Sequence, residues 1–153
     1  MALVRGRNLG NMREVHTHDE ARRLALPLGS EGGEHLFLRV GTVNSDGWLP
    51  ADVDLRIGGF TGSMSGDLRA GELNKLCSEL ETLHKRLVGE VIFTTLEGWI
   101  EIRFEGDGRG HIKVSGTVQD SPGIGNRLSF SVPFVDQTHL PDLIRALNAA
   151  VEI

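Results

Sequence analysis

The sequence predicts an α+β domain, in which a meander of about six or seven antiparallel strands packs two helices on one face. Apolar and polar residues alternate along several short segments, which is the pattern of half-buried antiparallel strands. Glycine-rich turns separate these segments. Two longer segments, at about 70–88 and 139–152, instead carry apolar residues every three or four positions, which indicates helices. One helix is therefore inserted between strands, and the other closes the chain.

The first two strands are expected on either side of a tight turn. Residues 35–43 form an apolar segment, and Asp46-Gly47 after it is a strong hairpin signal. Residues 48–59 alternate cleanly, so one side of this strand faces the core and the other faces solvent. A short strand at 60–64 is expected next. The outward residues of the second strand are Trp48, Asp52, Asp54 and Arg56.

The inserted helix has a readable start and end. Glu72 follows Arg69 by three residues, which is the spacing of a capping box, and Gly89 is well placed to stop the helix. Its apolar stripe consists of Leu73, Leu76, Cys77, Leu80, Leu83 and Leu87.

The segment 89–135 is expected to supply the remaining strands, one turn apart. The glycine-rich loop 106–110 separates two of them. The expected outward residues before this loop are Trp99, Glu101, Arg103 and Glu105. The expected inward residues of the last strand are Leu128, Phe130, Val132 and Phe134. Asp136 and Thr138 then cap the closing helix.

We expect residues 35–153 to form a single domain and residues 1–34 to form a partly ordered arm. The arm shows no sustained period of either kind, although a strand near 24–28 is an alternative there. The chain has 153 residues, a net charge of −5 and one cysteine, Cys77. A lone cysteine suits a reducing compartment, and no signal peptide or membrane span is evident, so we expect a cytoplasmic protein.

The acidic charge argues against nucleic acid as a direct ligand, because phosphate binding needs a basic surface. It favours solubility first, and association with a basic protein partner as the second interpretation. No membrane association is expected, and the oligomeric state stays open, a homodimer included.

The sequence predicts no catalytic, cofactor or metal site. The segment His16-Thr17-His18-Asp19-Glu20 contains metal-binding residue types, but it lies in the arm, where a solvated segment is the simpler interpretation. The glycine loop 106–110 precedes a strand and not a helix, so it is a hairpin and not a phosphate cradle. Cys77 lies in an apolar helix stripe, where a thiol serves packing.

One feature favours protein binding: two tryptophans are placed among charged residues on the outward face. Tryptophan and arginine are enriched at protein interfaces. The alternative is that these tryptophans pack at the rim of the sheet or beneath the arm. The candidate partner-binding residues are Trp48, Asp52, Asp54, Trp99, Glu101, Arg103 and Glu105.

From residue 35 to the C-terminus, the sequence resembles the WapI-type bacterial immunity proteins. The residues that carry the resemblance are Asp46-Gly47-Trp48-Leu49, Glu72, Leu73, Leu80, Leu83, Gly110-His111-Ile112, Gly116, Leu128-Ser129-Phe130 and Asp136-Gln137-Thr138-His139-Leu140. The resemblance implies a non-enzymatic protein that binds a cognate bacterial toxin domain and blocks it. A basic toxin domain, such as a nuclease, would suit this acidic chain.

A second function class stays open from the residues alone. It is a small-ligand-binding or enzymatic α+β domain, with its site between helix and sheet. A concave pocket lined by converging polar groups would favour this second class. A shallow acidic face over a solid core would favour the binding protein.

Overall fold

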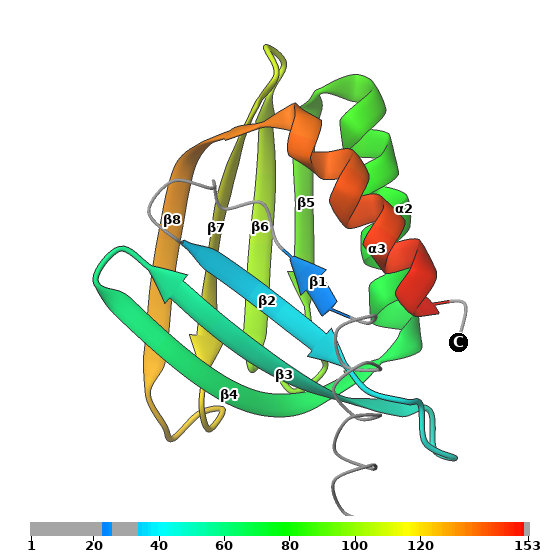
Figure 1. The fold of residues 1–153 in the computed structure, drawn as a ribbon, viewed down its shortest axis with the longest axis vertical. Helices are drawn as coiled ribbons and strands as arrows, with labels where there is room; N and C mark the ends of the chain where they lie inside the picture. Colours follow the sequence, from blue (N-terminus) through cyan, green and yellow to red (C-terminus); the bar gives the residue numbers. More distant parts are fainter. Residues whose placement is uncertain (1–22, 26–33, 152–153) are drawn as a thin grey trace, which may run out of the picture.

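A computed structural model describes residues 23–25 and 34–151 of the chain. Two groups of four strands alternate with two helices (Figure 1). The elements are β1 Arg23–Ala25, β2 His35–Val40, β3 Trp48–Ile57, β4 Phe60–Arg69, α2 Ala70–Arg86, β5 Val88–Thr94, β6 Ile100–Asp107, β7 His111–Gln119, β8 Arg127–Asp136, the 3-10 turn η2 Gln137–His139 and α3 Leu140–Val151.

The strands form two antiparallel sheets. Strands β1–β4 make the first sheet (sheet A) and β5–β8 make the second (sheet B), each in sequence order. The expectation of an antiparallel α+β domain with one inserted and one C-terminal helix is confirmed. The meander divides in two because α2 separates β4 from β5. The chain therefore consists of two consecutive units, each of four strands followed by a helix.

A single hydrophobic core joins the two sheets and the two helices. Buried residues of β2, β3, β6 and β7 belong to one cluster with those of α2 and α3. In Figure 1 the strands of sheet A cross in front of those of sheet B, and both helices lie along one side. Since each sheet turns one face to the shared core, the outward faces of sheets A and B are two separate surfaces.

Helix α2 begins with the expected capping arrangement. The Glu72 carboxylate accepts the backbone N–H of Arg69 at 2.9 Å, and its other oxygen accepts the N–H of Leu96 at 2.8 Å. Glu72 thus fixes the start of the helix to the turn between β5 and β6. The helix stops earlier than predicted, at Arg86, because Leu87 takes a left-handed conformation with φ 63°. The Leu87 carbonyl then accepts the N–H of Gly108 at 2.8 Å.

Strand β4 is longer than the predicted segment 60–64. It runs from Phe60 to Arg69 and pairs with β3 along its whole length. The glycines at positions 62 and 66 do not interrupt it, because both lie on the inward side, where other residues fill the space.

A bulge in β8 turns one side chain that was predicted to face inward out to solvent. Between Ile112 and Val114 the register with β7 shifts, so that Val135 is buried in place of Phe134. Phe134 is 76% exposed and meets the ring of His111 edge-on, with ring centroids 6.0 Å apart. The inward prediction for Phe134 is therefore wrong. Pro133, which has no N–H to donate, precedes it at the bulge.

Within the described residues, no helix is long and apolar enough to cross a membrane.

Candidate protein-interaction surface

The predicted outward residues divide between the two sheets. Trp48, Asp52 and Asp54 lie on β3 of sheet A, whereas Glu101, Arg103 and Glu105 lie on β6 of sheet B. The sequence placed them on one continuous face. The division into two sheets corrects that placement, and each group is described separately below.

On sheet A, the exposed charges are largely paired with one another. The guanidinium of Arg69, directly across from Trp48, lies 4.7 Å from the centre of the Trp48 ring. The Asp52 carboxylate accepts the hydroxyl hydrogen of Ser65 at 2.6 Å. The Asp54 carboxylate lies 3.6 Å from His35 Nε2 and 3.9 Å from an Arg39 nitrogen. Trp48, Asp52 and Asp54 therefore already have partners on this face.

Trp99 is a core residue and not an outward anchor. Its side chain is only 2% exposed, and its Nε1–H donates to the Asp67 carbonyl at 3.0 Å. Residues 95–99 form the turn before β6, so the alternation of that strand does not reach Trp99. The outward placement predicted for Trp99 is wrong, and the alternative of packing at the rim of the sheet describes it better.

On sheet B, the predicted charges stay open to solvent. Arg103 pairs with Glu90 of β5, with 3.1 Å between the guanidinium and the carboxylate. Glu101 and Glu105 make no side-chain hydrogen bond or ion pair with any residue in the described part of the chain. Glu90 lies directly across from Glu105, and two like charges at that position cost stability. The arrangement therefore keeps negative charge on this face at some cost to the fold.

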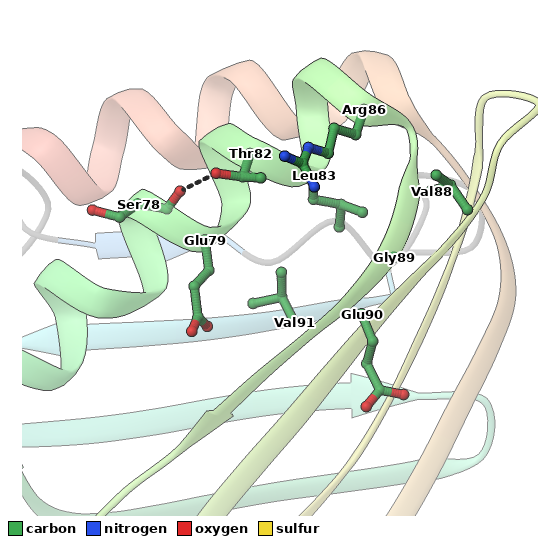
Figure 2. A pocket seen from close by; sticks show the side chains of 9 residues that line it. All are labelled: Ser78, Glu79, Thr82, Leu83, Arg86, Val88, Gly89, Glu90 and Val91. Carbon is green, nitrogen blue, oxygen red and sulfur yellow. Dashed lines mark hydrogen bonds between the residues drawn. The ribbon is translucent and has the colours of Figure 1, made fainter.

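A groove runs between α2 and β5, next to these charges (Figure 2). Its volume is about 350 Å³. Leu83 and Val91 give the lining its buried apolar part, and Glu79 and Glu90 line the groove from opposite elements. The other residues that line it are Ser78, Thr82, Arg86, Val88 and Gly89.

Negative charge is concentrated around this groove. Residues 70–107, which include α2, β5 and β6, contain eight Asp and Glu and four Lys and Arg, a net charge of −4. The segment 34–69 has a net charge of −2, and the segment 108–151 has +1. We call Glu79, Glu90, Glu101 and Glu105 the acidic strip. It runs from α2 across β5 to β6.

The sequence pointed to half of the acidic strip. Glu101 and Glu105 were predicted, whereas Glu79 and Glu90 were missed. Glu90 shares a face with Ile92, on a strand that the sequence indicates to be covered on both sides. Only the sheet order shows that β5 is an edge strand beside α2.

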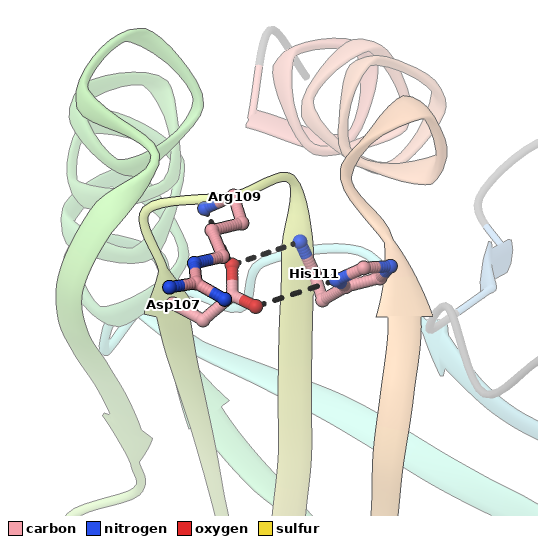
Figure 3. Close-up of polar contacts among 3 residues, drawn as sticks. All are labelled: Asp107, Arg109 and His111. Carbon is pink, nitrogen blue, oxygen red and sulfur yellow. Dashed lines mark hydrogen bonds and ion pairs between the residues drawn. The ribbon is translucent and has the colours of Figure 1, made fainter.

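The glycine loop 106–110 is a hairpin between β6 and β7, as predicted (Figure 3). One Asp107 oxygen accepts the backbone N–H of Arg109 at 2.6 Å and of His111 at 3.1 Å. The other oxygen lies 3.3 Å from His111 Nδ1. These contacts, the Arg109 N–H first, lower the pKa of Asp107. The carboxylate stabilises its own turn and does not present an anion site.

Two other carboxylates, Asp120 and Asp136, also accept hydrogen bonds from the loops that follow their strands. The Asn126 side chain and backbone donate to Asp120 and lower its pKa, which fastens the loop between β7 and β8. The backbone N–H of Thr138 donates to Asp136 at 2.9 Å and lowers the pKa of that carboxyl. Asp136 is therefore the cap of η2, in agreement with the capping role predicted for it.

Cys77 lies on the buried side of α2, as predicted. Its Sγ is 3.3 Å from the Asn148 Oδ1 of α3. Burial, followed by the nearby Glu81 carboxylate, raises the pKa of the thiol. A buried thiol with a raised pKa is a poor nucleophile, so its place in the fold is one of packing.

No group of three or more metal-ligating residues is found within residues 23–25 and 34–151. The segment His16–Glu20 lies outside the described residues.

Comparisons with known proteins give one family. No curated protein matches the sequence. A solved structure described as "Crystal structures of trypanosoma bruciei MRP1/MRP2" is similar, with a TM-score of 0.47 and 15% identity over 93% of this chain and 92% of that chain. The model of the Immunity protein WapI-like family matches residues 28–153. The chain therefore belongs to the WapI-like immunity protein family.

Proposed function

We propose that this chain neutralises a cognate bacterial toxin domain by binding to it directly, without catalysis of its own. Membership of the immunity family carries this proposal. The open acidic strip on sheet B supports a basic partner, because complementary charge speeds encounter and excludes wrong partners. We expect the chain to act in the cytoplasm of the cell that it protects.

Three carboxyl groups of the described residues have a lowered pKa, and in each the cause is a hydrogen bond within its own turn. This bears on the alternative that the chain is an enzyme. Asp107, Asp120 and Asp136 each accept backbone N–H groups of their own loops. Perturbed groups that gather in a cleft would favour an enzyme. Here Asp107 and Asp136 lie on either side of His111 at one end of sheet B, Asp120 follows β7 at the other end, and none of the three lines the groove between α2 and β5.

Co-expression tests the proposal. We expect the gene immediately upstream of this chain to encode a toxin domain that arrests growth when it is produced alone. We expect the chain to restore growth and the two purified proteins to elute together in size-exclusion chromatography. Unrestored growth, together with separate elution of the two proteins, would contradict the proposed function.

A further inference from the structure

Strand β5 leaves one edge of sheet B open beside α2. Among the strands of residues 23–25 and 34–151, it pairs with β6 alone, and the sheet order ends there. At Gly89, which lines the groove, a Cβ would meet no atom within 4 Å, so the groove above the strand is open at this point. Val88 beside it is 59% exposed. An exposed edge of this kind offers unpaired backbone N–H and C=O groups to another chain.

We propose that the groove between α2 and β5 receives an extended, basic segment of the toxin domain, which adds to sheet B as a fifth strand beside β5. This inference rests on the proposed function, because it names the surface and the chemistry of that binding. Addition of a strand supplies affinity through main-chain hydrogen bonds, while side chains of the added segment provide specificity.

The groove suits the long side chain of a lysine or arginine. Leu83 and Val91 offer apolar contact for the methylene groups of such a side chain. The carboxylates of Glu79 and Glu90 enter from the helix and from the strand, and Figure 2 shows Val91 between them. A cation that follows the apolar lining therefore meets negative charge on both sides.

The present partners of these carboxylates are easily exchanged. Glu79 lies 3.9 Å from Lys75, and Glu90 lies 3.1 Å from Arg103. All four side chains are well exposed, and ion pairs of exposed groups contribute little, typically about 0–1 kcal/mol. Arriving cations can therefore share these carboxylates. Glu101 and Glu105 extend the negative charge toward the rest of the partner.

One cation at the groove, Arg86, gives the bound segment a direction. It lies in the last turn of α2, next to Val88. The basic residues of the segment are therefore expected beside Glu79 and Glu90, and a carbonyl or acidic group beside Arg86.

Two substitutions test the groove, each with a matched control. Thr82→Trp fills the groove from an exposed helix position, and Asn74→Trp places the same bulk on an exposed position of α2 that does not line the groove. Glu90→Lys reverses a charge on edge strand β5, and Asp67→Lys does so on β4, the edge strand of sheet A. Melting temperatures of all four variants verify the fold.

The measurement is the affinity of the full chain for the toxin domain expected from the gene immediately upstream. We expect Thr82→Trp and Glu90→Lys to weaken binding by at least about 10-fold and the controls to change it less than about threefold. In hydrogen exchange, the amides of Val88–Thr94 should gain protection in the complex. Equal binding by all four variants, with no protection at β5, would overturn the proposal and leave the proposed function intact.

Two other outcomes also decide against the groove. If the unaltered chain does not bind the toxin domain, the proposed function fails and this inference fails with it. If the chain alone is a dimer that Thr82→Trp dissociates, while binding of the toxin domain is unchanged, the edge of β5 belongs to self-association.

Discussion

The indole of Trp99 crosses from one sheet to the other and donates its Nε1–H to the Asp67 carbonyl at 3.0 Å. Gly66, next to Asp67 on β4, makes room for the ring, because a Cβ at this position would clash with Trp99 Cε2. One aromatic side chain from the turn before β6 thereby joins sheet B to the edge strand of sheet A.

Substitutions at this contact are expected to lower the free energy of unfolding. Gly66→Ala forces the ring or the strand to move, at a cost of about 1–3 kcal/mol. Trp99→Ala leaves a cavity and an unpaired carbonyl, at a cost of about 3–5 kcal/mol. Urea denaturation measures both values. Gly71→Ala is the control, because a side chain there meets open space. A Trp99→Ala variant with unchanged stability would show that the ring is not in the core.

Alternation of side chains found the strands but could not place Trp99. A period of two indicates which residues share a face of one strand, and Trp99 precedes the strand that was used to place it. The burial of Trp99 depends on a glycine 33 positions earlier, in the other sheet. No local pattern contains such a contact, whereas both helices were predicted because their apolar stripes are local.

Two phenylalanines on β8 that were both predicted to face inward differ in burial: Phe130 is buried, whereas Phe134 is exposed. Phe134→Ala should cost less than about 1 kcal/mol, because the side chain is 76% exposed and loses chiefly its contact with His111. Phe130→Ala should cost about 3–5 kcal/mol, because that ring is buried and covers Gly116. The loss of stability in each variant is measured by thermal or urea unfolding. Equal losses would mean that the bulge at Pro133 does not reverse the strand.

Division of the meander into two sheets also changed the candidate surface. The sequence joined Trp48 and Asp54 to Glu101 and Glu105 because it treated all strands as one sheet. The insertion of α2 was predicted, yet its consequence, a new edge at β5, depends on strand order and not on periodicity. The negative net charge of residues 70–107 can be counted in the sequence, and it indicates this edge better than the alternation of side chains does.

Glu72 is expected to contribute more to stability than its place on the surface indicates. Its two oxygens accept backbone N–H groups of Arg69 and Leu96, and bonds to a charged acceptor are among the stronger ones. Glu72→Ala should lower the free energy of unfolding by about 1–3 kcal/mol. Glu72→Gln keeps one oxygen acceptor, so its free energy of unfolding should lie between those of the unaltered chain and Glu72→Ala. Glu97→Ala, an exposed carboxylate of the β5–β6 turn, is the control and should change stability by less than about 0.5 kcal/mol.

The carboxylates of the turns predict how stability depends on pH. Hydrogen bonds lower the folded-state pKa of Asp107, Asp120 and Asp136 below the ordinary value of 3.8. A group with a lowered folded-state pKa stabilises the fold fully above its unfolded pKa, and that contribution disappears as the pH falls through the folded pKa. The free energy of unfolding should therefore fall from about pH 4 downward as these groups take up protons.

Asp107→Asn isolates one of these carboxylates, because asparagine keeps an oxygen acceptor in the turn but cannot ionise. At pH 6 this variant should be less stable than the unaltered chain, since the amide oxygen is the weaker acceptor for the N–H groups of Arg109 and His111. As the pH falls below about 3.8, the unaltered chain loses the same charge, and the difference in unfolding free energy should shrink. Urea denaturation at a series of pH values measures it. A difference that stays constant down to about pH 2.5 would show that the Asp107 charge does not stabilise the hairpin.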